Sequence, residues 1–426
     1  MDPARPAQAR RSPGHSAMTP DDPTPRPGDP IRAPATPART ARRPGLSTPR
    51  AFRCQCGRPV FFRNSRCLAC DTPLGYDPAR RRLLPLEPSP RGEGLWRRHG
   101  GSLRSTEYRR CANLDSAAGC NWLVERKDDN PLCRCCRLTR TVPDLSVPEN
   151  ADWWGLIEQA KRRLVSSLVA LGLPVRSRQV EDPDRGLAFD LLRAPPEGPP
   201  VTTGHLNGVI TLDIQEADDL TREHRRTFLH EPYRTLLGHL RHEVGHYYWL
   251  RLVLGTPWEE PCRALFGDER ADYAAALQSH YANGPPEDWR AHFVSAYASA
   301  HPAEDWAETW AHYLHVVDTI DTATAFGLDT ARVGLVYERF PLDILQDESA
   351  ASAEAFMGFL TDWMELTGVL NELSRSMGLA DFYPFILSAP AVRKLHFVHR
   401  VVQGAFEART APRPGGRRQS GARREA

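Results

Sequence analysis

The stretch RHEVGHYYWLRL, residues 241–252, holds two histidines four positions apart and a glutamate directly after the first. Pro232 suits the first position of a helix and Gly255 suits its end, so we expect one helix of about 23 residues here. At about 100° per residue, His242 and His246 then project from one face and can bind the same metal ion. An ordinary buried helix is the alternative, because so short a pattern also arises by chance.

A catalytic metal site needs more than two histidines. Glu243 lies about 100° round the helix from His242, close enough to take a proton from a water on the metal without being a ligand. Catalytic zinc usually has three protein ligands. Two later segments offer the third: FGDERADYAAALQSHY contains Asp268, Glu269 and Asp272, and HPAEDWAETWAHYLH contains Glu304, Glu308, His312 and His315. Acids buried among the tryptophans of the second segment would need a cation or hydrogen bonds.

Length and hydropathy limit the class of protein. The 426 residues are enough for more than one domain and a sizeable core. No apolar run approaches 18 residues, and residues 1–30 lack an apolar segment behind a basic start, so we expect neither a transmembrane helix nor a secretory signal. The expected address is cytoplasmic, with no membrane contact. Ten cysteines in that compartment indicate metal binding and not disulfides.

Charge changes sign along the chain although the net charge is only +2. Residues 1–50 hold nine Arg, four Asp and twelve Pro, the composition of a disordered leader. Residues 51–145 hold 18 basic against 10 acidic side chains (+8), and residues 146–411 hold 23 against 38 (−15). We therefore expect two modules with different partners, followed by a disordered basic tail at 412–426.

Nine of the ten cysteines crowd into the basic module in closely spaced groups. Two close pairs of thiolates match a tetrahedral zinc, which so small a segment needs in order to fold. The first expected structural site comprises Cys54, Cys56, Cys67 and Cys70. The second comprises Cys111, Cys120, Cys133 and Cys136, with Cys135 as an alternative last ligand. Free buried cysteines are the alternative for both sets.

The acidic module begins with a helical pattern and continues with strands. Apolar residues recur at helical spacing over 152–174. LAFDLL (187–192) and GVITLDI (208–214) are short, rich in branched residues and bounded by Gly and Pro, as strands are. Nearly every periodic segment after residue 216 is helical. A small sheet followed by many helices predicts an α+β fold.

Together these motifs resemble a known family. RHEVGHYYW, FGDERADYAAALQSHY, SAYASAHPAEDWAETWAHYLHVVDT and RSMGLADFYPF, behind FRCQCGRPVFFRNSRCLACDTPLGY, are similar to the bacterial zinc-binding metallopeptidases with an N-terminal zinc ribbon, over about residues 52–405. The resemblance implies a mainly helical, zincin-like peptidase domain with a small β-sheet, preceded by a small zinc-ribbon module. Two departures from the family pattern are a narrower first cysteine pair and Ala303, where the family has tryptophan.

The segment EDWAETWAHY also resembles the E-x-x-A-E helix of gluzincins of the lethal-factor type. That resemblance implies that Glu304 is the third ligand of the catalytic zinc and that Glu308 orients a ligand histidine. It also implies that Tyr297 stabilises the oxyanion. Glu269 is the alternative third ligand, because thermolysin-like sites use a shorter spacing. The remaining histidines are expected to make structural or supporting contacts: His239, His312 and His315.

The expected reaction is metal-assisted hydrolysis of an amide in a protein or peptide substrate, with Glu243 as general base. By analogy with zincins, the strand GVITLDI would pair with the substrate at the sheet edge. One catalytic and two structural zinc ions are expected. The alternative function makes the basic zinc-ribbon module a nucleic-acid-binding or protein-docking unit beside an inactive or scaffold zincin domain.

Overall fold

The computed structural model describes residues 50–410, except residues 103, 196, 229–234, 329, 331–332, 334–339 and 346–349. Within these residues the fold is α+β, as predicted, with helices in the majority. Apart from Arg50, the predicted leader and tail lie outside the described residues. No helix in the described part of the chain is both long and apolar enough to cross a membrane.

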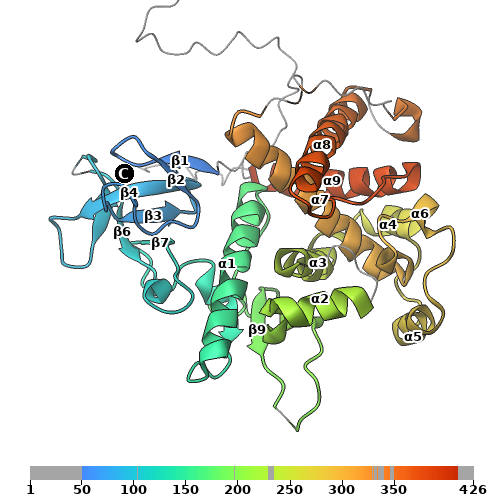
Figure 1. Cartoon of the computed structure of the whole chain (residues 1–426), viewed down its shortest axis with the longest axis horizontal. Coiled ribbons are helices and arrows are strands. Elements are labelled where there is room, and N and C mark those ends of the chain that lie inside the picture. The colour runs from blue at the N-terminus through green and yellow to red at the C-terminus, as the bar shows by residue number, and fades with distance from the viewer. Residues whose placement is uncertain are drawn as a thin grey trace, which may run out of the picture. The chain divides into compact units, whose positions relative to one another are not determined.

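The cysteine-rich region of the chain forms two antiparallel sheets (blue to cyan in Figure 1). A two-stranded sheet joins β1 (Ala51–Arg53) and β2 (Pro59–Phe61). A five-stranded sheet has the order β3-β4-β5-β6-β7. Its strands are β3 (Leu74–Asp77), β4 (Arg82–Pro88), β5 (Trp96–Arg98), β6 (Glu107–Arg110) and β7 (Leu123–Glu125). Buried Tyr76 and Trp122, with ring centroids 5.0 Å apart, fill the core of this region.

A four-stranded sheet follows, with the order β10-β11-β9-β8. Its strands are β8 (Thr139–Thr141), β9 (Ala188–Leu192), β10 (Gly204–Leu206) and β11 (Val209–Asp213). The two predicted strands are β9 and β11, which pair in parallel. The prediction that GVITLDI forms the sheet edge is wrong, because β10 pairs antiparallel with β11 and takes the edge position. A turn at Asn207 and Gly208, both with positive φ, makes this hairpin possible.

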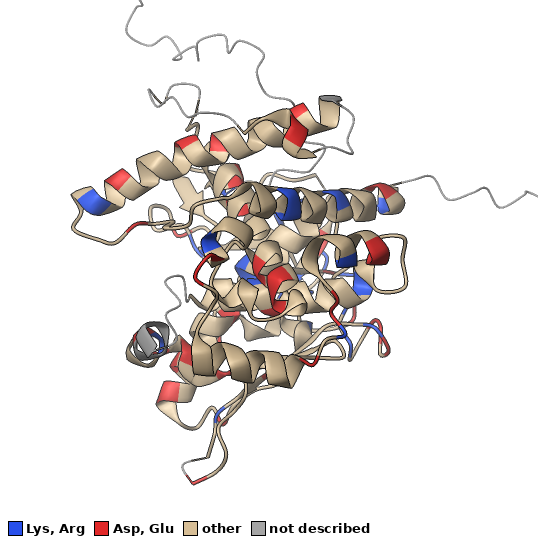
Figure 2. Cartoon of the chain, turned by 90° about the vertical axis from the view of Figure 1, so that its right-hand side faces the viewer, with Lys and Arg blue, Asp and Glu red and all other residues tan. Residues whose placement is uncertain are grey.

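Helices make up most of the remaining chain (Figure 1). They are α1 (Pro148–Ala170), α2 (Asp219–Phe228), α3 (Leu236–Tyr248), α4 (Glu259–Phe266), α5 (Tyr273–Asn283), α6 (Trp289–His292), α7 (Pro302–Ala325), α8 (Ala350–Ser376) and α9 (Ala389–Thr410). The charged residues of α8 are mainly acidic and those of α9 mainly basic, as the colours along the two helices show (Figure 2). Short 3-10 turns include η3 (Ile214–Ala217) and η5 (Tyr297–Ser299).

The helix that carries the two histidines is shorter than predicted. Thr235 caps it by accepting a hydrogen bond from the Gly238 N–H, so α3 begins at Leu236, and Pro232 lies outside the described residues. After Tyr248 the backbone continues as one π-helical turn, Trp249–Val253, before Gly255 ends the segment with φ of 69°. The capping threonine thus sets the first turn that the proline was expected to set.

Helices α3 and α7 approach each other closely at Gly245. A Cβ added there would lie 3.0 Å from the Ala307 Cα and 3.2 Å from the Trp310 Cβ, so a glycine is needed at this crossing. The Trp306 indole donates a hydrogen bond to the Gly245 carbonyl oxygen at 2.9 Å, although that oxygen belongs to the other helix. This contact brings the polar faces of the two helices together.

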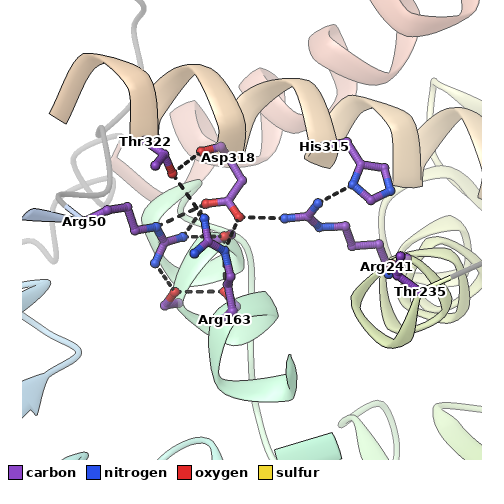
Figure 3. Close-up of polar contacts among 10 residues, drawn as sticks. Arg50, Arg163, Thr235, Arg241, His315, Asp318 and Thr322 are labelled. Atoms are coloured by element: carbon purple, nitrogen blue, oxygen red, sulfur yellow. Dashed lines mark hydrogen bonds and ion pairs between the residues drawn. The ribbon is translucent and has the colours of Figure 1, made fainter. Parts of the chain in front are cut away.

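A buried charge network joins α1, α3 and α7 to the residue that precedes β1 (Figure 3). The Asp318 carboxylate on α7 accepts hydrogen bonds from Arg50 at 2.6 Å and from Arg163 and Arg241 at 2.7 Å each. Arg50 also donates to the hydroxyl of Ser166 at 2.8 Å. Arg50, Arg241 and Asp318 are all buried, so the network holds four segments of the chain together around one carboxylate.

Candidate metal centre

Three side chains from α3 and α7 converge on one point. The Nε2 atoms of His242 and His246 lie 3.2 Å apart. The Glu304 carboxylate lies 3.0 Å from Nε2 of His242 through Oε2 and 3.5 Å from Nε2 of His246 through Oε1. Ligand atoms around a tetrahedral zinc with bonds of 2.0–2.1 Å are about 3.4 Å apart, so these three residues fit a zinc ion.

The alternative third ligand lies elsewhere. The Glu269 carboxylate forms a salt bridge with Arg263 at 2.6 Å, and this guanidinium holds the pKa of Glu269 below its ordinary value. Glu304, by contrast, is 1% exposed. The structure therefore brings Glu304, and not Glu269, beside the two imidazoles.

Two of the three predicted ligands, His242 and Glu304, are oriented by a second residue. The Glu308 carboxylate lies 2.7 Å from Nδ1 of His242, which leaves Nε2 of that ring directed at the metal point. The Ser295 hydroxyl donates to the other oxygen of Glu308 at 2.6 Å. The Tyr273 hydroxyl donates to Oε1 of Glu304 at 2.8 Å. Glu308 lies where it was predicted, whereas Ser295 and Tyr273 were not predicted.

Glu243 has the environment of a proton acceptor. It is buried, and burial raises the pKa of its carboxyl to about 7. Among the described residues, its Oε2 atom has no hydrogen-bond partner. A buried carboxylate without a partner is costly in a fold and typical of a functional site, where water or substrate completes its contacts.

The two cysteine sets also converge. In the first, Sγ atoms lie 3.6 Å apart for Cys54 and Cys70 and 3.8 Å apart for Cys56 and Cys67. In the second, Sγ of Cys120 and Cys133 lie 3.6 Å apart. Zinc–sulfur bonds of about 2.3 Å place tetrahedral ligands about 3.8 Å apart, so both sets fit a zinc ion.

The structure also separates the two candidates for the last thiolate. The four Sγ atoms of the second set, Cys111, Cys120, Cys133 and Cys136, lie within 4.8 Å of one another. Cys135 is fully buried but does not belong to this group. All four members of the second set are buried, whereas Cys56 and Cys70 of the first set are exposed.

Comparison with known proteins identifies the family of each part of the chain. The model of the family described as "Putative zinc-binding metallo-peptidase" matches residues 150–401, and a zinc-ribbon domain model matches residues 51–147. The chain belongs to this zinc-binding metallopeptidase family. Relatives that are 43% identical over 355 residues, 83% of this chain and 95% of theirs, include "Uncharacterized protein Rv2568c" of Mycobacterium tuberculosis and "Uncharacterized protein Mb2598c" of Mycobacterium bovis. No solved structure matches the chain.

In this member of the family, aromatic side chains surround the point where the three ligand candidates converge. Tyr297, the predicted oxyanion residue, opens the turn η5, and its ring centroid lies 5.9 Å from that of His242. Burial raises the pKa of the Tyr297 hydroxyl well above its ordinary value, so the group stays protonated and can donate a hydrogen bond. His280 of α5 contacts the Tyr297 ring at 5.9 Å. Helix α5 therefore reaches the metal centre through two of its side chains, Tyr273 and His280.

The remaining histidines make contacts within the fold. His239 lies 3.5 Å from the Glu216 carboxylate, and Nδ1 of His312 bonds the Tyr383 hydroxyl at 2.6 Å. His315 bonds Arg241 of the buried charge network. His205 of β10 was not predicted, and its ring stacks on that of His246 with centroids 6.4 Å apart. The edge strand β10 consequently lies beside the metal centre.

The sequence pattern alone could not identify the three residues near the metal point that were not predicted. Tyr273 stands in FGDERADYAAALQSHY, the segment whose acids were weighed as ligands. Ser295 and His205 occur outside any motif. Their positions depend on which loops fold back over α3 and α7, and sequence spacing does not carry that information.

Proposed function

We propose that this protein is a zinc peptidase that hydrolyses peptide bonds in protein or peptide substrates. One observation carries the proposal: His242, His246 and Glu304 meet within ligand distance of one another. Next to them lies the buried carboxylate of Glu243, whose Oε2 atom has no hydrogen-bond partner in the described part of the chain. A metal-storage or purely structural site would not need a proton acceptor beside it. The two cysteine sets are proposed to hold structural zinc, giving three ions per chain.

A zinc ion held by His242, His246 and Glu304 would supply Lewis acidity, polarising a carbonyl oxygen and making water a better nucleophile near neutral pH. Glu243 takes the proton from the attacking water, and its raised pKa keeps it able to pass the proton to the leaving nitrogen. The protonated Tyr297 hydroxyl donates toward the negative charge that develops on the carbonyl oxygen. Glu308 keeps the His242 ring in the orientation that metal binding requires.

The substrate backbone is proposed to lie along β10. This strand is an edge of its sheet, and His205 on it stacks on His246. An edge strand presents unpaired N–H and C=O groups, which can align an extended peptide beside the metal centre. Small amides lack such a backbone, so this feature favours peptides over small-molecule substrates.

The substitution Glu243→Gln tests the mechanism. The amide fills the same space but cannot accept a proton, so we expect full zinc content and a loss of turnover of about 10²–10⁴-fold or more. The measurement is mass-spectrometric detection of cleavage in a mixed peptide library, with zinc counted per chain in both proteins. Cleavage at the same rate in the variant and the parent would reject Glu243 as the base. A parent that cleaves no peptide would reject the peptidase proposal.

A further inference from the structure

A pocket of about 490 Å³ opens in the zinc-ribbon region and is lined only by residues between Ala51 and Tyr108. Its volume falls in the range of about 300–1,000 Å³ that is typical of ligand sites. Apolar groups of Phe52, Leu83 and Pro85 contribute to its wall. None of these residues belongs to the metal centre or to either cysteine set.

The charge of the pocket is one-sided. No carboxylate lines the pocket. Four exposed arginines do: Arg53, Arg80, Arg82 and Arg98. Arg80 is engaged with Asp77 at 2.7 Å and with the Tyr108 hydroxyl at 2.6 Å. In the described part of the chain, no acidic side chain pairs with Arg82 or Arg98. These two guanidiniums are therefore available to an anionic ligand.

Strand edges border the same pocket. In the described sheets, β1 pairs with β2 alone. In β4, residues 82–85 pair with β3 on one side, whereas β5 pairs only with residues 86–88. The Pro85 carbonyl accepts from the His99 N–H on the β5 side, and Leu83, two residues earlier, directs its backbone groups to that same side. The free backbone edge and the arginines thus face a common space.

The character of the wall selects among anionic ligands. Single-stranded nucleic acid needs exposed aromatic rings on which bases stack, but Phe52 and Tyr108 are only 9% and 2% exposed. A free phosphate would use neither the apolar wall nor the strand edge. An extended peptide uses the strand edge, the apolar wall and the arginines together. Its backbone pairs with the edge, while its side chains alternate between the two faces.

We propose that this pocket binds an extended acidic peptide segment of another protein, which adds a strand beside β4 and places carboxylates against Arg82 and Arg98. This docking site goes beyond the proposed peptidase activity and does not depend on it. Binding through partly exposed charges is expected to weaken as salt concentration rises.

The test is fluorescence polarisation of a labelled ten-residue peptide of alternating Glu and Val, with the full chain carrying Glu243→Gln so that the peptide stays intact. We expect saturable binding that becomes about tenfold weaker in Arg82→Ala/Arg98→Ala. The matched control is Arg58→Ala/Arg63→Ala, which removes the same charge from exposed arginines outside the pocket and should change affinity by less than about twofold. All four arginines are exposed, so zinc content and thermal unfolding are expected to match those of the parent.

Modified peptides test the contribution of charge and the contribution of backbone hydrogen bonds separately. Replacing Glu by Lys, or N-methylating alternate peptide bonds, should each abolish binding, because the first removes the charge match and the second removes the strand hydrogen bonds. Equal losses in the two arginine pairs would overturn the proposal in favour of unspecific charge attraction. Tighter binding of a ten-nucleotide oligothymidylate, or full displacement of the peptide by inorganic phosphate, would overturn it in favour of a nucleic-acid or phosphate site.

Discussion

At the scale of single residues, the metal centre depends on how each ligand is held. A ligand carboxylate that is free to rotate loses affinity for its ion, and groups that fix ligands affect affinity nearly as strongly as the ligands do. Glu304 has such a partner in Tyr273, at the start of α5. His242 has one in Glu308, which is itself fixed by Ser295. The ligand set is therefore preorganised on two of its three sides.

Tyr273→Phe is expected to weaken zinc binding at this centre by about 10–100-fold, because the Glu304 carboxylate loses its hydrogen bond. Competition with a fluorescent chelator measures the affinity without requiring activity. Ser279→Ala is the control on the same helix, since it also removes a hydroxyl, but Ser279 is exposed, accepts a hydrogen bond from Asn283 and belongs to none of the three metal groups. An unchanged affinity in Tyr273→Phe would show that Glu304 needs no such support.

At the scale of elements, the crossing of α3 and α7 decides whether the ligands meet. His242 and His246 come from one helix and Glu304 from the other, and Gly245 sits at the closest approach. Any side chain there must separate the helices or shift Trp310. The ion pairs around Asp318 hold the far side of the same crossing, where Arg241 directly precedes His242 (Figure 3).

Gly245→Ala is expected to lower the free energy of unfolding by about 1–3 kcal/mol, because the added methyl overpacks the helix contact, and to reduce zinc affinity as Glu304 moves from the histidines. Gly358→Ala in α8 is the control, since a Cβ there meets nothing within 4 Å and alanine favours helix by about 1 kcal/mol. Urea unfolding monitored by circular dichroism measures the free energy of unfolding of both variants, and competition with a fluorescent chelator measures their zinc affinity. A stabilised Gly245→Ala protein would contradict the close contact.

Asp318 makes stability depend on pH. Burial would raise the pKa of its carboxyl, but Arg50, Arg241 and Arg163 together hold that pKa well below its ordinary value. A depressed carboxyl pKa contributes stability above the unfolded pKa of about 3.9, and that contribution is lost as the pH falls toward the folded pKa. Acid should therefore weaken the network only below about pH 4.

Asp318→Asn at pH 7 is expected to cost about 3–5 kcal/mol in urea unfolding, because it leaves buried guanidiniums without their carboxylate. The difference from the parent should shrink below about pH 4. Asp381→Asn, which breaks a salt bridge to exposed Arg375, should cost about 1 kcal/mol or less at any pH. A difference that is constant from pH 7 to pH 3 would contradict the linkage.

At the scale of the whole molecule, three proposed metal sites of different burial share one chain. The first cysteine set has two exposed members, whereas the second set is buried throughout. Lys161 and Glu158 of α1 are both buried and form a salt bridge at 2.5 Å. The Lys161 ammonium also donates a hydrogen bond to the Thr139 hydroxyl, and β8, which holds Thr139, comes shortly after Cys136 in the chain. The second zinc site therefore lies next to contacts that join the cysteine-rich region to α1.

Metal analysis of the purified protein is expected to find three zinc ions per chain, with two in Cys70→Ser and two in His246→Ala. During titration with a chelator, the exposed first set should lose its ion before the buried second set. Removal of the second ion should lower the thermal unfolding temperature of the whole chain, since α1 loses its neighbour. A parent protein that holds only one zinc would contradict at least one of the two cysteine assignments.

Much of the site was predictable because its spacing is local. Positions four apart on a helix share a face whatever surrounds them, so His242 with His246, and Glu304 with Glu308, could be paired from sequence. Cysteine spacing likewise indicated both thiolate sets. The start of α3, the edge position of β10, and the roles of Tyr273, Ser295 and His205 were not predicted, because each depends on a neighbour distant in sequence or on a competing local signal.

By itself, the sequence determined the fold class, the two histidines on one helical face and the cysteine groups, since helical period and ligand spacing are properties of short segments. Only the tertiary structure placed Glu304, and not Glu269, beside the two histidines, and Cys136, and not Cys135, beside the other three thiols. It also decided which strand borders the metal centre. The physical reason is that a metal needs its ligands within about 3–4 Å of one another, and for separate segments that distance is set by packing, here by the contact of Gly245 with Ala307.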